Sequence, residues 1–177
     1  MQPPYIIFDR DGTLIDLVHH LIDPDLVKLK PKVVSGLRLL KEYGFNFGII
    51  TNQSVINRGY ATKEVVDQVN ERILNLLKKE DIEFKFIKYC PHLPDDLCKC
   101  RKPANLLGLQ AINEFNIDAS RSFMIGDMES DVIFGHAIGF RSIQLTSDES
   151  SQSEPDFVAA DMIAAAEWIL KVSKGEK

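Results

Sequence analysis

The sequence is short of positive charge, of aromatic side chains and of long apolar runs. Its 21 Lys and Arg residues are outnumbered by 26 Asp and Glu residues, so the formal net charge is −5, and only 8% of residues are aromatic. Affinity for long nucleic acid comes mainly from clustered basic side chains. No apolar run approaches the roughly 20 residues that span a bilayer. The composition therefore argues against nucleic acid and against a membrane as partners.

Cysteine is also scarce, and its three copies fall close together, at Cys90, Cys98 and Cys100. The first five residues lack the basic region and the apolar stretch of a signal peptide, so we expect a cytoplasmic protein. In a reducing compartment such a cluster favours a metal over a disulfide framework. The 177 residues are enough for one domain over 1–177, and we expect a monomer.

Short apolar runs alternate with longer amphipathic ones along the chain. The runs predict strands at 5–8, 45–51, 84–89, 122–125 and 141–145. The amphipathic segments predict helices at 32–43, 62–79, 104–115, 131–138 and 159–172. Residues 147–156 are polar and predict a surface loop. Alternating strands and helices indicate an α/β protein, a single Rossmann-like domain of three layers with a central parallel sheet.

Polar residues gather directly after four of the predicted strands. Because ligands bind outside the carboxyl ends of parallel strands, these four loops are expected to converge on one site. They contain Asp9 to Asp11, Thr51 to Ser54, Cys90 to Lys102, and Gly126 with Asp127.

Asp9 and Asp11 place two carboxylates just past a buried strand, with Gly12 allowing a sharp turn. Mg²⁺ prefers such hard oxygen ligands, and it shields a phosphate so that a carboxylate can approach phosphorus. One carboxylate can attack, and the other can serve as general acid and base. The alternative is a surface loop with two solvated aspartates.

The cysteines and one histidine form the pattern Cys90-x-His92-x₅-Cys98-x-Cys100. Three thiolates and an imidazole make a closed tetrahedral zinc site of the structural kind, with no position left for a reactive water. Such a zinc-binding loop at 90–100 would fix Arg101 and Lys102. The alternative is a set of incidental cysteines.

Four segments resemble, in order, the motifs of the haloacid dehalogenase (HAD) superfamily of aspartate-nucleophile phosphatases. They are Asp9-Arg10-Asp11-Gly12-Thr13, Ile49-Ile50-Thr51-Asn52-Gln53, Cys100-Arg101-Lys102-Pro103 and Gly126-Asp127-Met128-Glu129-Ser130-Asp131, so the resemblance spans about residues 5–145. It implies that Asp9 is the nucleophile and Asp11 the acid/base, and that Thr51 and Lys102 hold the phosphate charge. It also implies that Asp127 binds Mg²⁺ beside Asp9 and the backbone carbonyl of Asp11, supported by Asp131.

The cysteine pattern followed by Arg-Lys-Pro resembles one branch of that superfamily, which has little or no cap domain. This branch contains D-glycero-D-manno-heptose 1,7-bisphosphate 7-phosphatases and histidinol-phosphate phosphatases. Short connections at 16–31 and 79–84 leave no room for a large cap. The site is therefore expected to be open.

The segment from Thr51 to Tyr60 resembles the heptose enzymes, and we expect Asn52, Ser54, Arg58 and Arg101 to contact the substrate. Arg58 would meet a second anionic group, such as a sugar 1-phosphate. Histidinol phosphate carries an amine instead and is the alternative substrate. A non-catalytic, zinc-stabilised phosphate-binding module is a further alternative, followed by a phosphatase for nucleic-acid ends and a phosphotransferase.

Overall fold

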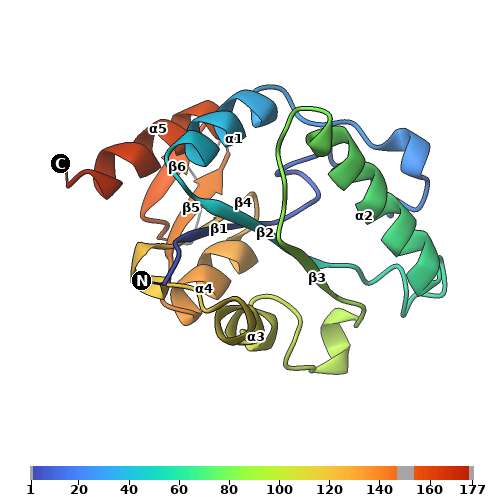
Figure 1. Cartoon of the computed structure of the whole chain (residues 1–177). Helices are drawn as coiled ribbons and strands as arrows, with labels where there is room; N and C mark the ends of the chain where they lie inside the picture. Colours follow the sequence, from blue (N-terminus) through green and yellow to red (C-terminus); the bar gives the residue numbers. More distant parts are fainter. Residues whose placement is uncertain (1, 147–153, 176–177) are drawn as a thin grey trace.

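The fold is built on one sheet of six parallel strands, described by a computed structural model for residues 2–146 and 154–175. Their order is β3-β2-β1-β4-β5-β6 (Figure 1). The strands are β1 (Tyr5–Phe8), β2 (Asn46–Asn52), β3 (Phe86–Cys90), β4 (Phe123–Gly126), β5 (Arg141–Leu145) and β6 (Phe157–Ala159). The predicted α/β class with a parallel sheet is confirmed. Most of the predicted polar loop, residues 147–153, lies outside the described residues.

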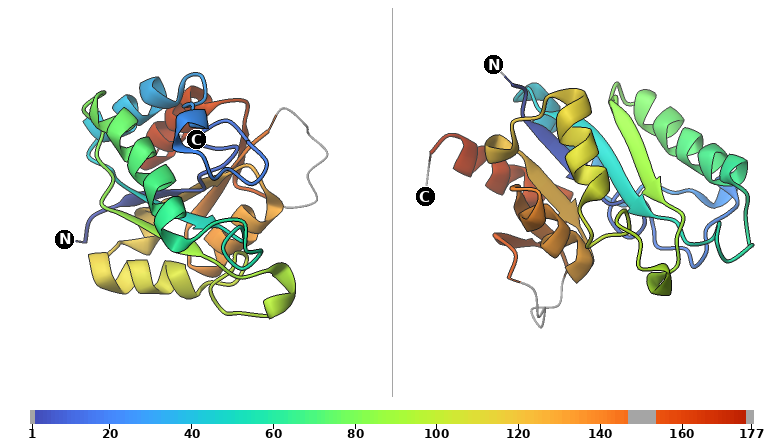
Figure 2. Two further views of the ribbon diagram at one scale, coloured as in Figure 1. Left: turned by 90° about the vertical axis from the view of Figure 1, so that its right-hand side faces the viewer. Right: turned by 90° about the horizontal axis from the view of Figure 1, so that it is seen from below.

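Helices cover both faces of the sheet, which gives three layers (Figures 1 and 2). One core cluster joins the sheet to α1 (Val33–Glu42), α2 (Lys63–Lys78) and α5 (Met162–Ser173). The other joins it to α3 (Leu106–Phe115) and α4 (Glu129–Ala137). The alternation along β1 shows why: Ile6 and Phe8 point into the first cluster, and Tyr5 and Ile7 into the second.

Strand β6 was not predicted, because Ala159 was assigned to the start of the last helix and the two residues before it to no element. The last helix starts later than predicted because Asp161 caps it. The carboxylate of Asp161 accepts hydrogen bonds from the N–H groups of Ile163 and Ala164, so α5 begins only at Met162. The residues before this cap are left extended and pair with β5.

The helix predicted at 131–138 begins two residues earlier, at Glu129. The carboxylate of Asp131 accepts from the backbone N–H of Met128, which caps the first turn.

The strand order places the switch point of the sheet beside β1, with β2 on one side and β4 on the other. The N–H of Asp9 donates to the carbonyl of Ile125 at 2.9 Å, so the loops after β1 and β4 leave the sheet side by side. Between β1 and α1 the only helix is a single turn, η1 (Pro24–Leu26), so no cap domain is inserted there. Nowhere in the described part of the chain is a helix long and apolar enough to cross a membrane.

The contact of α1 with α5 gives a stability prediction. Leu37 of α1 is completely buried, whereas Leu109 of α3 is 48% exposed. We expect Leu37→Ala to lower the free energy of unfolding by about 2–5 kcal/mol, through lost burial and the cavity left behind. Leu109→Ala should change it by no more than about 0.5 kcal/mol. Urea denaturation of both variants measures the difference, and equal effects would contradict the assignment of this core.

Candidate active site

Three carboxylates meet at the carboxyl ends of β1 and β4. Oxygen atoms of Asp9, Asp127 and Asp131 all lie within 4.8 Å of one another. Two glycines make this approach possible. A Cβ on Gly12, whose φ is +80°, would lie 2.3 Å from the Asp127 carboxylate, and a Cβ on Gly126 would lie 2.2 Å from that of Asp131. Any larger residue at either position would displace a carboxylate.

Lys102 places one ammonium group among these carboxylates. Its Nζ lies 2.7 Å from Oδ1 of Asp9 and 2.6 Å from Oδ1 of Asp131, and its side chain is only 2% exposed. Burial opposes the charge on Lys102, but Asp131 and Asp9 outweigh it and raise the pKa of Lys102 above its ordinary value. The lysine therefore stays charged between the two carboxylates.

Lys102 pairs with Asp9 and Asp131, whereas Lys30 acts on Asp127 only through its charge, so the three carboxylates are not balanced. Burial, followed by the charge of Asp9, raises the pKa of Asp127. Burial also raises the pKa of Asp131 to about 6, although the charge of Lys102 opposes that shift. Both carboxylates thus sit where another positive charge would stabilise their ionised forms. Oxygen ligands converging on excess negative charge fit a divalent cation such as Mg²⁺.

Asn52, at the end of β2, holds the loop that carries Lys102. Its Nδ2 donates to the carbonyl of Lys102 at 3.1 Å, and its Oδ1 accepts from the Lys102 N–H at 3.0 Å. The neighbouring Arg101 donates to the carbonyl of His92 at 3.1 Å. Asn52 and Arg101, both predicted to contact substrate, are therefore engaged with the backbone of this loop.

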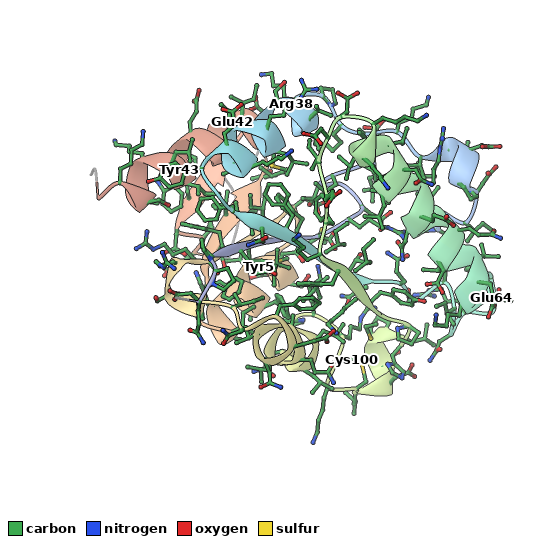
Figure 3. The ribbon with its side chains drawn as sticks, in the orientation of Figure 1. Tyr5, Arg38, Glu42, Tyr43, Glu64 and Cys100 are labelled. Carbon is green, nitrogen blue, oxygen red and sulfur yellow. The ribbon has the colours of Figure 1, made fainter. Side chains whose placement is uncertain are left out.

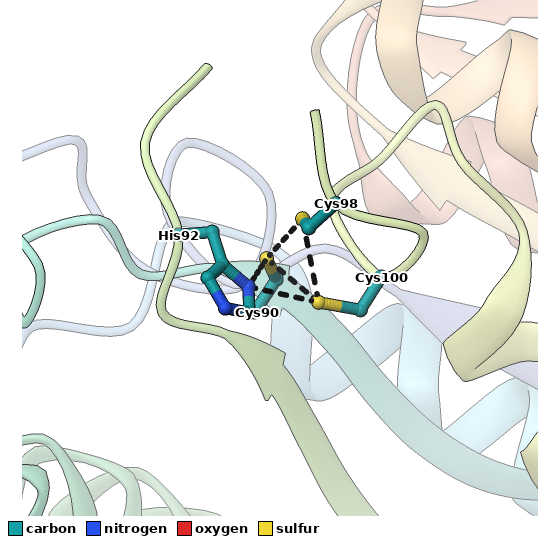
Figure 4. A group of neighbouring side chains, drawn as sticks. All are labelled: Cys90, His92, Cys98 and Cys100. Atoms are coloured by element: carbon teal, nitrogen blue, oxygen red, sulfur yellow. Dashed lines mark hydrogen bonds between the residues drawn. The ribbon is translucent and has the colours of Figure 1, made fainter. Parts of the chain in front are cut away.

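The thiols of Cys90, Cys98 and Cys100 surround Nδ1 of His92 (Figure 4). The sulfur atoms lie 3.1 to 3.5 Å apart, and Nδ1 lies 3.4 Å from Cys90 and 3.2 Å from Cys100. Burial raises the pKa of Cys90 and opposes ionisation of Cys98, but backbone N–H groups of Cys100 and Arg101 lower the pKa of Cys98 to about 7. The four donors converge as the ligands of one metal ion do.

Asp11 is held by residues that the sequence interpretation gave no role. Nε and Nη2 of Arg10 donate to its two carboxylate oxygens at 2.9 and 3.2 Å. Gln53 donates to Oδ2 of Asp11 at 2.8 Å and to the hydroxyl of Thr51 at 3.1 Å. The presence of Gln53 in the second motif was the available signal. The burial of Arg10 depends on Asn70, 60 residues away, and no local pattern indicates it.

Ser54 and Arg58 lie on the segment that follows β2, and they contact each other. Nε of Arg58 donates to the hydroxyl of Ser54 at 3.4 Å, and the arginine is exposed. A cavity of about 540 Å³ is lined by Asp127 together with residues that include Thr13, Lys30 and Leu145. Thr13 donates to Oδ1 of Asp127 at 3.2 Å. Of the three clustered carboxylates, that of Asp127 thus faces open space in which a small molecule fits.

Comparison with known proteins places the chain in a family. A family model described as HAD-hydrolase-like matches residues 99–166. The D-glycero-beta-D-manno-heptose-1,7-bisphosphate 7-phosphatase of Yersinia pestis is 35% identical over 94% of this chain and 89% of its own length. The histidine biosynthesis bifunctional protein HisB of Blochmanniella floridana is 35% identical over 81% of this chain, which spans only 41% of that relative.

The fold is also that of a solved structure of D,D-heptose 1,7-bisphosphate phosphatase from B. bronchiseptica, complexed with magnesium and phosphate. The TM-score is 0.83 at 23% identity, over 96% of this chain and 99% of the other. The chain belongs to the HAD-like phosphatase family, in the branch that contains the heptose-bisphosphate 7-phosphatases. The resemblance drawn from the four motifs is confirmed.

The cysteine–histidine group gives a prediction about metal content. We expect the purified protein to carry one tightly bound metal ion per chain and His92→Gln to lose it, because three thiolates alone leave the tetrahedral set incomplete. His136→Gln is the matched control, since His136 lies on the surface of α4 and contacts Asp156. Elemental analysis of the three proteins decides, and a metal retained by His92→Gln would refute the ligand set.

Proposed function

We propose that the chain is a Mg²⁺-dependent phosphatase that hydrolyses a small sugar phosphate through an aspartyl-phosphate on Asp9. One observation carries this proposal: Lys102 and two further carboxylates converge on Asp9 at the switch point of the sheet. A carboxylate approaches an anionic phosphate only where positive charge screens the two, and this site holds a lysine and a set of cation ligands. The family relationship supports the same assignment.

Lys102 binds Oδ1 of Asp9, so we assign the attack on phosphorus to Oδ2. The P–O bond to the sugar breaks as the bond to Asp9 forms, and Lys102 offsets the negative charge. The hydroxyl of Thr51, buried at the end of β2, binds a phosphate oxygen that is not transferred.

Asp11 donates a proton to the departing sugar oxygen in the first half of the reaction. In the second half it takes a proton from the water that attacks the phosphorus of the aspartyl-phosphate. The phosphate leaves, and Asp9 and Asp11 return to their starting states.

Asp9, Asp127 and the backbone carbonyl of Asp11 are the residues that would hold Mg²⁺. Asp131 would support the ion without binding it directly, because its carboxylate contacts Lys102 and the Met128 N–H. Mg²⁺, when bound, screens the negative charge of the phosphate from the carboxylates. We assign zinc to the cysteine–histidine group, since thiolate and imidazole ligands in a tetrahedral set favour it.

The substrate proposed is D-glycero-D-manno-heptose 1,7-bisphosphate, attacked at its 7-phosphate. The relative from Yersinia pestis bears that activity in its name and aligns with nearly the whole chain. Arg58, exposed after β2, would meet the 1-phosphate. Histidinol phosphate is the second candidate, since this chain also aligns with part of the bifunctional histidine-biosynthesis proteins. We place the enzyme in the cytoplasm, as one domain and a monomer, without nucleic acid or membrane as partner.

The proposed function predicts the outcome of a substrate assay. With Mg²⁺, the protein should release phosphate from the heptose bisphosphate, and Asp9→Asn should be slower by roughly a thousandfold or more, because an amide is a poor nucleophile. Release from histidinol phosphate alone would move the assignment to the second candidate. A folded protein that hydrolyses neither, nor any simple phosphate ester, would instead be a phosphate-binding module.

The role of Arg58 has its own prediction. Arg58→Gln should raise KM for the heptose bisphosphate several-fold and leave kcat nearly unchanged, because the contact is remote from the reacting bond. KM for p-nitrophenyl phosphate, which lacks a second phosphate, should not change. Arg121→Gln is the matched control, because Arg121 lies in the turn before β4, at the amino end of that strand and thus away from the site. An unchanged KM for the bisphosphate would remove Arg58 from the substrate site.

A further inference from the structure

Among the residues that the structure describes, Arg10 is the largest with less than 2% of its surface exposed. Burying a guanidinium requires that its donors be paired, and four of its five N–H groups are used. Two bind the carboxylate of Asp11 side by side, one binds Oε1 of Gln53 at 2.8 Å, and one binds Oδ1 of Asn70 at 2.8 Å. Asn70 lies on α2, so the network ties the loop after β1 to a helix.

The donors of Arg10 also fix the orientation of Gln53. A guanidinium can only donate, so the oxygen of the Gln53 amide must face Arg10 and its nitrogen must face Asp11 and Thr51. The hydroxyl of Thr51 then accepts from Gln53, and its own proton is left for another acceptor such as a phosphate oxygen. One buried arginine thereby determines the direction of two hydrogen bonds at the site.

Asp11 receives three hydrogen bonds, two from Arg10 and one from Gln53, while 19% of its side chain stays exposed. Two N–H groups of the Arg10 guanidinium and the amide of Gln53 hold this carboxylate in one side-chain orientation. Only the exposed part of the carboxylate is then left to meet the leaving group. Acid–base catalysis depends on such placement, since an error of about 1 Å costs roughly a hundredfold in rate.

We propose that Arg10 is a positioning residue: together with Gln53 and Asn70 it fixes the acid/base carboxylate of Asp11 and, through Gln53, orients the hydroxyl of Thr51. This inference rests on the proposed function. Arg10 touches neither the substrate nor the nucleophile in this role, and its effect on the reaction passes through Asp11.

A leaving-group comparison tests the proposal. Arg10→Lys keeps the charge but loses the fork. We expect kcat for the heptose bisphosphate to fall by roughly a hundredfold with KM little changed, because departure of an alkoxide needs the acid. With p-nitrophenyl phosphate, whose leaving group needs no acid, the burst of nitrophenolate should slow less than about tenfold, while the following steady phase slows by roughly a hundredfold. Equal loss in burst and steady phase would mean general damage and overturn the proposal.

A double-mutant cycle on the bisphosphate gives an independent readout. If Arg10 acts through Asp11, Arg10→Lys should slow Asp11→Asn no further. A double variant slower than Asp11→Asn by the full single effect would refute the proposal, as would a fully active Arg10→Lys beside an impaired Asp11→Asn. A fully active Asp11→Asn would instead contradict the proposed function itself.

Two further variants guard against misfolding. Arg38→Lys makes the same exchange on the outer face of α1, across the molecule from Cys100 (Figure 3), and should keep full activity and melting temperature. Should Arg10→Lys fail to fold, Gln53→Leu takes its place, since it removes one donor to Asp11 and leaves the ion pair. We expect the same pattern at roughly tenfold, and a burst slowed as much as the steady phase would again overturn the proposal.

Discussion

The ion pairs of Lys102 with Asp9 and Asp131 are the interaction on which the rest of the site depends. Three carboxylates within 4.8 Å of one another repel each other, and burial raises the pKa of Asp127 and Asp131. Removing the ammonium of Lys102 would leave that repulsion to be relieved by protonation or by movement of the loops. The lysine therefore holds Asp9 and Asp131 in place, and the excess negative charge that remains is of the kind that attracts a divalent cation.

A buried lysine at the end of a loop has to be brought there and held. Two sets of contacts hold the loop that carries Lys102. The cysteine–histidine group precedes Lys102 and is anchored in β3 through Cys90, while the amide of Asn52 binds both backbone polar groups of Lys102. A loop without regular structure thus gains the precision of the sheet, because two neighbouring strands contribute its anchors.

The sequence predicted the sheet and the convergence of four loops, since buried strands and the polar residues after them are local signals. It did not predict β6, because the last helix was predicted to start at Ala159, whereas the cap at Asp161 delays that start to Met162. Nor did it predict Arg10, because a charged residue between two aspartates reads as exposed unless its distant partner Asn70 is known. Asn52 was predicted to bind substrate because of its place in a motif. Its contact with Lys102 joins residues 50 positions apart in the sequence, which no local pattern indicates.

The absence of a cap between β1 and α1 makes the Arg10 network intelligible. A cap that closes over a phosphatase site excludes water and presses substrate and acid/base into register. In a site without a cap, the proposed acid/base Asp11 has to be held by contacts within the core domain itself. Arg10 and Gln53 supply that constraint through their hydrogen bonds to Asp11, and Asn70 of α2 holds Arg10 in turn. Burying an ion pair costs desolvation energy, so we expect this pair to fix geometry more than to add stability. If Asp11 is the acid/base, as proposed, specificity for one leaving group can arise from this rigid carboxylate, of which 19% is exposed.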